Sequence, residues 1–298
     1  MDDIKELEAN LEVTVRFLSE EIGARSYKDL EELKRSADYV EEKMVSFGCD
    51  VKRQSFTYTG NTYHNIIGEV SPVRKNISNG VRGDKESGTL IIGAHYDTVP
   101  GTPGADDNAS GIAGLLELAR LAALKPSPRT VRFVAFTLEE PPLFKTRHMG
   151  SYMYAKSLKK EKVKVEGMIS LEMIGYFCER KGCQNYPLPF FKLFYPEKGD
   201  FIAFVGNISS RAFTKGVKNA FQKASTLPVE SLNTVSIIPG VDFSDHSSFW
   251  SFGYPAFMIT DTAFYRNPNY HTAGDRAHTL DYKRMALLIN GLKSALIS

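Results

Sequence analysis

Residues 1–70 carry apolar positions in two different periods. A helical spacing near the N-terminus predicts a first helix, and the residues that form its apolar stripe are Leu7, Leu11, Val15 and Leu18. A second helix is expected between Ser26, a candidate N-cap, and Gly48, a candidate end signal. Residues 50–58 and 63–70 then alternate with a period of two, which is typical of strands. The polar stretch 71–88 has no period and predicts an exposed loop.

The rest of the chain alternates strands with helices. Strands are predicted at Thr89–Ala94, Thr130–Thr137, Val163–Ser170, Phe201–Val205 and Pro255–Thr260, and helices at Ser110–Leu124, Gly150–Lys159, Ser209–Lys223 and from about Leu280. This order is typical of an α/β fold in which a mostly parallel sheet lies between two layers of helices. No repeat and no linker divides the chain, so we expect a single domain over 1–298, with N-terminal helices and a hairpin in 1–70.

The composition excludes several classes of protein. The 298 residues include 37 Lys and Arg and 35 Asp and Glu, which gives a net charge of +2. This charge is not the large positive excess that is typical of proteins that bind nucleic acid. No apolar run approaches the ~18 residues of a membrane span, so no membrane contact is expected. The charged start MDDIKELEANLEV lacks the basic end and apolar core of a signal peptide. We therefore expect a cytoplasmic protein, although export of a processed form stays open, and the oligomeric state is not indicated.

Six polar clusters follow predicted strands or lie in the loops between elements. In α/β sheets, functional groups gather at the carboxyl ends of the strands. The clusters are His95 and Asp97 in HYD, Asp106 and Asp107 in GADDNASG, the pair Glu139 and Glu140, Glu172 in SLEMIGY, Asp245 and His246 in SDHSSF, and Tyr270, His271 and Asp275 in NYHTAGD. Taken singly, several of them also suit an ordinary polar strand end or turn. Two glutamates where a buried strand emerges are nevertheless costly unless positive charge faces them.

Convergence of these clusters creates a charge imbalance that metal ions relieve. Four carboxylates, from Asp107, Glu139, Glu140 and Glu172, do not all remain ionised around one point without cations. Two divalent ions offset four negative charges, and neutral imidazoles are suitable additional ligands. Nitrogen and oxygen donors without thiolate fit zinc, with manganese or cobalt as alternatives. The chain has neither an HExxH motif nor a GxSxG elbow, the signatures of two other hydrolase classes.

Taken in order, GAHYDT, GADDNASG, the Glu pair, SLEMIGY, SDHSSF and YHTAGD resemble the M28 family of co-catalytic zinc peptidases. The resemblance covers the metal-site part, 89–298, and the N-terminal helices and hairpin also suit the family. It implies an eight-stranded mixed sheet between layers of helices. It also implies an aminopeptidase that holds two zinc ions per chain and acts on peptides with a free N-terminus.

The resemblance implies a metal ligand for each matching motif. One zinc is expected to take His95 and Glu172, and the other Glu140 and His271. The carboxylate of Asp107 is expected to bridge the two ions. The peptide bond that follows Asp107 is expected to be cis, as is typical of the family.

The resemblance also implies catalytic and supporting residues. Glu139 is expected to be the general base, which takes a proton from a metal-bridging water and returns it to the leaving amine. Tyr270 resembles a residue that stabilises the oxyanion in some members. Asp97 is expected behind His95 to fix its tautomer. Asp245 and His246 are expected behind the ligands or beside the substrate.

Two departures from the family pattern leave alternatives open. Glu172 stands where members often have aspartate, and PPLFKTRHMGS (141–151) replaces a shorter GLxGS segment, which puts the local pocket shape in question. Other dizinc amidohydrolase or carboxypeptidase chemistry is one alternative, and a one-zinc glutaminyl cyclase-like acyltransferase is another. A non-enzymatic module on the same fold is a third alternative, and the complete ligand set argues against it.

Two groups of residues have more than one interpretation. Cys178 and Cys183 are close enough in sequence to form a bridge, but the missing signal peptide favours two reduced thiols. Four aromatic residues either shape an apolar pocket for the first substrate side chain or pack in the core. They are Phe243, Phe249, Phe264 and Tyr265.

Overall fold

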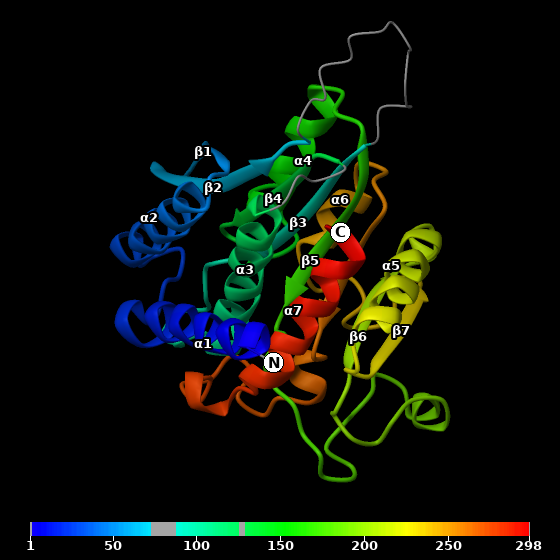
Figure 1. Cartoon of the computed structure of the whole chain (residues 1–298). Coiled ribbons are helices and arrows are strands. Elements are labelled where there is room, and N and C mark those ends of the chain that lie inside the picture. The colour runs from blue at the N-terminus through cyan, green and yellow to red at the C-terminus, as the bar shows by residue number, and fades with distance from the viewer. Residues whose placement is uncertain (1, 73–87, 125–128, 298) are drawn as a thin grey trace, which may run out of the picture.

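A mixed β-sheet forms the centre of the computed structural model, which describes residues 2–72, 88–124 and 129–297 (Figure 1). Within that part of the chain the sheet has eight strands in the order β1-β2-β4-β3-β5-β8-β6-β7. They are β1 (Asp50–Tyr58), β2 (Asn61–Val70), β3 (Thr89–His95), β4 (Val131–Phe136), β5 (Val165–Glu172), β6 (Ile202–Asn207), β7 (Val229–Thr234) and β8 (Ala256–Thr260). The pairs β1–β2, β2–β4 and β6–β8 are antiparallel and the others parallel. The predicted α/β class and strand number are confirmed.

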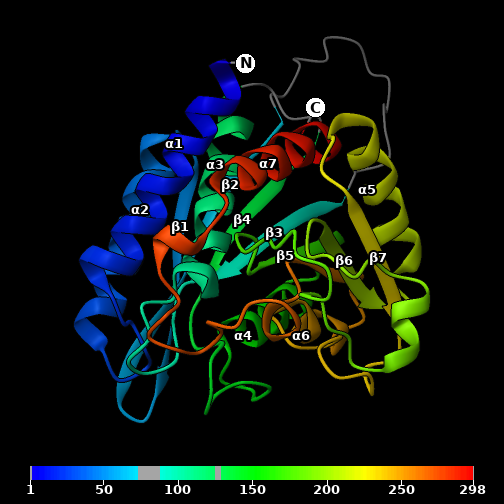
Figure 2. The same cartoon turned by 90° about the horizontal axis from the view of Figure 1, so that it is seen from below.

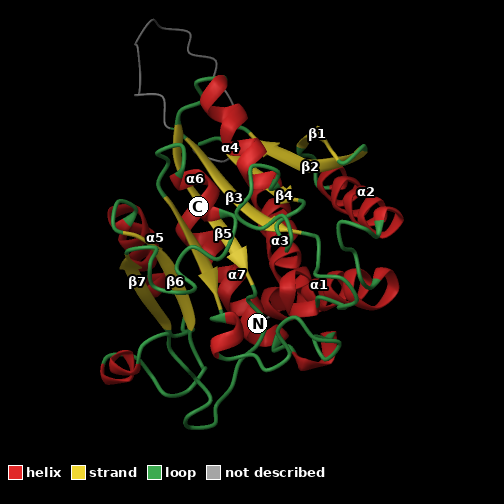
Figure 3. Ribbon diagram, turned by 180° about the vertical axis from the view of Figure 1, so that it is seen from behind, coloured by secondary structure: helices red, strands yellow, loops and turns green. Residues whose placement is uncertain are grey.

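Helices cover both faces of this sheet. They are α1 (Asp2–Arg16), α2 (Leu30–Ser46), α3 (Gly111–Ala123), α4 (Gly150–Lys160), α5 (Arg211–Ala224), α6 (His246–Trp250) and α7 (Tyr282–Leu296). Figure 2 shows α4 and α6 on one face and α2, α3 and α5 on the other. On that second face α1 packs against α3 and α7, and α7 packs against α3 and α5. Figure 3 shows loops gathered beyond one end of the central strands, the end toward which β5 points in Figure 1.

The apolar stripes of the two N-terminal helices are buried, as their spacing predicts. Leu7, Leu11, Val15 and Leu18 are at most 2% exposed, although α1 ends at Arg16 and the chain continues in a wider π-helical turn. The expected N-cap at Ser26 is wrong, because α2 begins at Leu30 after Asp29. The N–H and hydroxyl of Ser26 instead donate to the carboxylate of Asp29 at 3.0 and 2.6 Å, so the two polar residues form a turn before the helix.

Several strand boundaries differ from the sequence expectation by one or two residues, and one whole strand was not expected. The hairpin strand β2 begins at Asn61, and β5 continues to Glu172, two residues beyond its expected end. The edge strand β7, VESLNT, was not expected, because it lies at the end of the sheet and only Val229 in it is buried. A strand of this kind lacks the apolar run that marks a central strand. Of the loop expected at 71–88, residues 73–87 lie outside the described part.

The cysteine pair corrects a further expectation. Cys178 and Cys183 form a disulfide, with Cα atoms 6.4 Å apart, so the interpretation as two reduced thiols is wrong for this structure. The chain turns back here, because Cys178 pairs with Gly199 in an isolated antiparallel bridge. Among the described helices, none combines the length and apolar character that crossing a membrane requires.

The disulfide predicts the number of titratable thiols. We expect one free thiol per chain, from buried Cys49, when the protein is unfolded without reductant. Titration with a thiol reagent before and after reduction measures this number. Three thiols in the unreduced protein contradict the bridge, and Cys49→Ser, which should leave none, identifies the free one.

Candidate metal centre

The predicted ligands meet at the carboxyl ends of neighbouring strands. His95 is the last residue of β3, Glu139 and Glu140 follow β4, and Glu172 is the last residue of β5. These strands are adjacent and parallel, so they end at the same edge of the sheet. Loops bring in the remaining ligands, Asp107 from 105–110 and His271 from the segment after β8.

The carboxylate of Asp107 lies between two imidazoles. Its Oδ1 is 3.3 Å from Nε2 of His95, and its Oδ2 is 3.1 Å from Nε2 of His271. The peptide bond between Asp107 and Asn108 is cis. The side chain of Asn108 fastens this loop to β5, because its amide donates to the carbonyl of Leu171 at 2.9 Å and its oxygen accepts the N–H of Met173 at 3.1 Å.

Each imidazole also faces one glutamate. Nε2 of His95 is 3.4 Å from Oε1 of Glu172, and Nε2 of His271 is 3.3 Å from Oε2 of Glu140. The side chains therefore form two groups of one histidine and one glutamate that share Asp107. Glu139 lies beside the first group, with Oε2 3.9 Å from Nε2 of His95.

Two aspartates hold the loops that carry the ligands. The carboxylate of Asp97 accepts the N–H groups of Glu139 and Glu140, both at 3.1 Å, and Nδ1 of His95 lies 3.1 Å from the main-chain oxygen of Asp97. Asp275 accepts the N–H groups of Asp106 and Asp107 at 2.8 and 3.0 Å. These two hydrogen bonds hold the main chain of the Asp107 loop in place. The position of Asp275 in the NYHTAGD turn did not indicate this role.

Asp106 points away from the other acidic side chains of the centre. Its carboxylate accepts the N–H of Gly175 at 2.9 Å and the side-chain amide of Asn267 at 2.7 Å. Burial and the nearby charge of Asp261 raise the pKa of Asp106 well above its ordinary value. Of the adjacent pair, Asp107 is thus the residue that faces the histidines.

The SDHSSF motif contributes a residue that was not predicted. The hydroxyl of Ser244 donates to Oε2 of Glu172 at 2.7 Å. Asp245 is fully buried, and among the described residues no group donates a hydrogen bond to its carboxylate oxygens. Burial raises its pKa to about 7. Nε2 of His246 lies 2.9 Å from the carbonyl of Val241, and its ring packs edge-on against Trp250. His246 therefore has packing contacts where contacts with ligands or substrate were expected.

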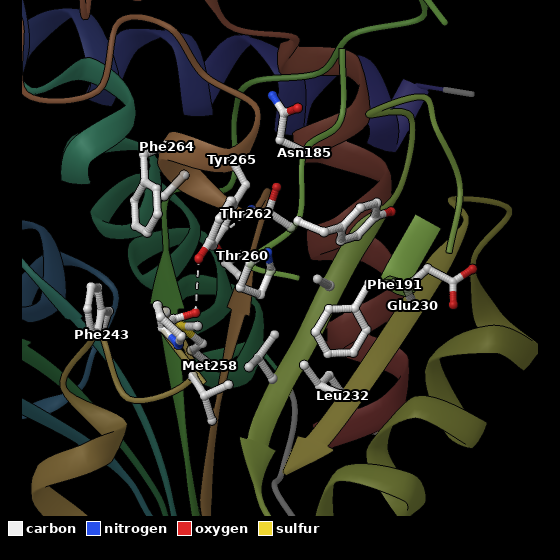
Figure 4. A pocket seen from close by; sticks show the side chains of 18 of the residues that line it. Asn185, Phe191, Glu230, Leu232, Phe243, Met258, Thr260, Thr262, Phe264 and Tyr265 are labelled. Carbon is white, nitrogen blue, oxygen red and sulfur yellow. Dashed lines mark hydrogen bonds between the residues drawn. The ribbon is translucent and has the colours of Figure 1, made fainter. Parts of the chain in front are cut away.

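An apolar pocket opens beside the two histidine groups (Figure 4). Its volume is about 850 Å³ including the open mouth, and Glu172 and Tyr270 line the end that borders the metal ligands. The ring of Tyr270 stacks on His271 with centroids 3.7 Å apart. Three of the four aromatic residues suggested by the sequence line the pocket, namely Phe243, Phe264 and Tyr265. Phe249 packs in the core between the sheet and α4 instead.

The unusual loop after Glu140 reaches the mouth of this pocket. The ring of Phe144 meets that of Phe243 edge-on at 5.7 Å, and the ammonium of Lys145 lies 4.6 Å from the centre of the Phe243 ring. Lys145 also pairs with Asp242 at 2.7 Å. The longer segment therefore supports one wall of the pocket.

The protein groups alone shift each other's pKa values strongly. Burial by itself lowers the pKa of His95, but the charges of Glu172 and Glu139 outweigh it and raise the pKa well above its ordinary value. The pKa of His271 rises to about 10, because Asp107 and Glu140 outweigh its burial. Burial and the charge of Asp107 raise the pKa of Glu140 to about 8. The centre therefore attracts positive charge.

The donor set fits metal ions. Donor atoms around a tetrahedral zinc, at ~2.0–2.1 Å from the ion, are roughly 3.3 Å from one another. The imidazole-to-carboxylate separations of 3.1–3.4 Å match this spacing. Donor atoms of His95, Asp107 and Glu140 lie within 4.8 Å of one another, and Oε1 of Glu140 is buried without a hydrogen-bond partner. Nitrogen and oxygen donors without thiolate are typical ligands of zinc and related divalent ions.

A buried arginine compensates part of the negative charge from behind. Arg25 has no exposed surface, and burial lowers its pKa to about 10, opposed by the charges of Asp275, Asp107 and Asp97. Within the described part of the chain, its guanidinium donates only to main-chain carbonyls, those of Leu18, Gly23, Tyr96, Pro103 and Gly104, at 2.7–3.2 Å. It thereby ties the N-terminal segment to the loops that carry the ligands. No sequence pattern marks Arg25, because its partners are carbonyls that any residue provides.

These contacts predict a large effect of Arg25→Met on stability. The change removes the guanidinium donor from five main-chain carbonyls, of which those of Leu18 and Gly104 keep a main-chain donor. Because the other three lose their donor in a largely buried region, we expect the free energy of unfolding to fall by at least ~3 kcal/mol. Urea unfolding with a chelator present measures the protein without a contribution from metal. Arg35→Met, an exposed position on α2, is the control and should change stability by less than ~0.5 kcal/mol. Equal stability of the two variants contradicts the role of Arg25.

Comparisons with known proteins identify the family. The model of Peptidase family M28 matches residues 76–292. The chain is 44% identical to the uncharacterized protein YfbL of Escherichia coli K12 over 95% of this chain and 85% of YfbL. It is 37% identical to aminopeptidase YwaD of Bacillus subtilis, over 41% of this chain and 24% of YwaD. The structure of BSAP, a zinc aminopeptidase from Bacillus subtilis, covers the fold with a TM-score of 0.72 at 19% identity, over 97% of this chain and 95% of that one. The chain therefore belongs to Peptidase family M28 and is a peptide-hydrolysing enzyme.

Proposed function

We propose that this enzyme is a two-zinc aminopeptidase that removes the first residue of peptides. The observation that carries the proposal is the position of the Asp107 carboxylate between His95 and His271, at 3.3 and 3.1 Å, beside an apolar pocket. A carboxylate with both oxygens directed at different histidines suits a bridge between two ions. The zinc named for the similar Bacillus subtilis structure supports the choice of metal.

The ligands divide into two sets in this proposal. His95 and Glu172 would hold one zinc, Glu140 and His271 would hold the other, and Asp107 would be shared. Manganese or cobalt would suit the same donors. Asp97 keeps His95 and the two glutamates in place, and Ser244 orients Glu172 by its hydrogen bond.

Glu139 carries the proton transfers. The zinc ions, when bound, would supply a water with its pKa lowered to about 7 and would polarise the substrate carbonyl. The Glu139 carboxylate takes the proton of the attacking water and then gives it to the leaving amine. Its buried position 3.9 Å from His95, without a main-chain or side-chain hydrogen bond to its carboxylate among the described residues, leaves it available for this exchange. Tyr270, which is stacked on His271, directs its phenol toward the carbonyl oxygen as negative charge develops there.

Acidic side chains at the inner end of the pocket favour a substrate with a free N-terminus. Glu172 lines this end, and Glu139 lies next to it. An α-ammonium group here makes charge-assisted hydrogen bonds that an internal peptide bond does not make. The first side chain then enters the apolar pocket. Carboxypeptidase, amidohydrolase and cyclase chemistry are not favoured, because the family match supports peptide hydrolysis and the similar aminopeptidase YwaD supports the choice of the N-terminus.

Two variants separate proton transfer from metal binding. Glu139→Gln should lower kcat by about 10²–10⁴-fold, the usual contribution of a general base, while zinc content stays near two ions per chain. Asp107→Asn should lower zinc content, because the shared ligand loses its charge. Plasma mass spectrometry of dialysed protein gives the metal content, and the exposed Glu161→Gln is the control. Equal metal loss in the first two variants contradicts this division of roles, and a wild-type content of one zinc contradicts the two-ion centre.

Blocking the N-terminus of the substrate tests aminopeptidase action. Acetylation of a leucyl or phenylalanyl amide should lower kcat/KM by about tenfold to a hundredfold, the scale of one lost charged hydrogen bond of ~1.5–3 kcal/mol. Part of the loss should appear in KM, because the contact also exists in the ground state. The same kcat/KM for free and acetylated substrates would show that the free amine is not recognised.

A further inference from the structure

The floor of the apolar pocket is a row of paired residues that crosses four strands. Glu172 of β5 pairs with Thr260 of β8, Thr260 with Ala203 of β6, and Ala203 with Glu230 of β7. Directly paired residues point to the same face of a sheet, and all four side chains line the pocket. A ligand carboxylate and a second carboxylate therefore stand at opposite ends of one row, with two small side chains between them.

Apolar groups border this row. The next paired row supplies Met258, Val205 and Leu232, and the aromatic rings of Phe191 and Tyr195 cover the outer part. Figure 4 shows Phe191, Leu232 and Glu230 on the side of the pocket opposite to Phe243 and Phe264. A side chain that runs along the row thus meets apolar groups, and Glu230 lies at the far end of the row.

The distance along the row suits a long side chain. Neighbouring strands lie ~4.7–4.9 Å apart, so three spacings separate the Cα atoms of Glu172 and Glu230 by roughly 14 Å. The substrate ammonium near Glu172, a first side chain and its contact with Glu230 must together span this gap. Leucine or valine leaves the outer part empty, whereas arginine and lysine combine a long apolar stem with a cationic end.

Glu230 lacks a partner of its own. Within the described part of the chain, its carboxylate makes no hydrogen bond or ion pair, and partial burial raises its pKa. The nearby cation Lys218 is on the other face of the sheet, where its ammonium donates to the hydroxyl of Ser231 at 3.1 Å. A partly buried carboxylate without a partner at the end of an apolar pocket is a natural acceptor for a cation from the substrate.

We propose that Glu230 is a specificity residue that selects peptides whose first residue is arginine or lysine. The stem of that residue lies over Ala203 and between Met258 and Phe191, and its cationic end pairs with the Glu230 carboxylate. Arginine is favoured over lysine, because its planar group makes bidentate contacts with a carboxylate and stacks on aromatic rings. This assignment rests on the proposed aminopeptidase function.

Paired substrates of equal size isolate the charge. Arginyl and citrullinyl amides of aminomethylcoumarin differ in the charge of the end group, and leucyl amide reports the reaction itself. We expect kcat/KM of the wild-type enzyme to be about tenfold higher for arginyl than for citrullinyl amide, the scale of one charged hydrogen bond. Glu230→Gln should reduce this ratio to near one while hydrolysis of leucyl amide changes by less than about twofold. Glu161→Gln, an exposed carboxylate outside the pocket, should keep the wild-type ratio.

Each other outcome has a definite meaning. Equal rates for arginyl and citrullinyl amides, with leucyl amide hydrolysed, overturn the role of Glu230 and leave the aminopeptidase standing. An arginine preference that survives in Glu230→Gln overturns it as well. Loss of leucyl amide hydrolysis in that variant alone shows that Glu230 supports the fold rather than specificity. If the zinc-loaded wild-type enzyme hydrolyses none of the amides, the result contradicts the proposed aminopeptidase function. It then also contradicts the specificity role of Glu230, which rests on that function.

Discussion

The concentration of negative charge at one edge of the sheet is the constraint on which the rest of the site depends. Several buried carboxylates stand close together there, on Asp97, Asp107, Glu139, Glu140 and Glu172. Burial makes each ionised group costly unless positive charge faces it. Nearby carboxylates raise the pKa values of His95 and His271, which favours their positively charged forms. The buried guanidinium of Arg25 supplies further positive charge close to these carboxylates. Divalent ions would balance the same negative charge, so the residues that accommodate this charge also suit metal ions.

The geometry of the ligands is secured by groups that are not ligands. Asp97 and Asp275 each accept two main-chain N–H groups from a loop that carries ligands, and Ser244 fixes one oxygen of Glu172. The sheet adds a second kind of order, because the strand register that ends at Glu172 continues to Glu230. The candidate metal centre and the pocket floor therefore lie on one continuous sheet, and in the proposed function this places the pocket for the first side chain next to the reacting bond.

Much of this arrangement could be predicted from the sequence. Apolar runs located the central strands, and the order of strands and helices predicted the α/β class. The motifs that follow those strands predicted which side chains lie close together in the candidate metal centre, because the carboxyl ends of adjacent parallel strands meet at the same edge of the sheet. Spacing did not separate Phe249 from Phe243, although one packs in the core and the other lines the pocket. Both are aromatic residues near the same motif, and only packing distinguishes them.

The sequence by itself determined the class of the fold and the chemistry of the donor set, because both depend on local periodicity and on the residue types that follow each strand. Only the tertiary structure decided how the charge is balanced and how the pocket is built. Arg25 is far in sequence from the loops that it holds, and its partners there are main-chain carbonyls. Because every residue has a main-chain carbonyl, the residue types in these loops do not predict the contact. Glu230 lies on an edge strand without an apolar run, and its relation to Glu172 exists only through pairings across three neighbouring strands. Local patterns carry no information about such registers, because register is set when the strands pack together.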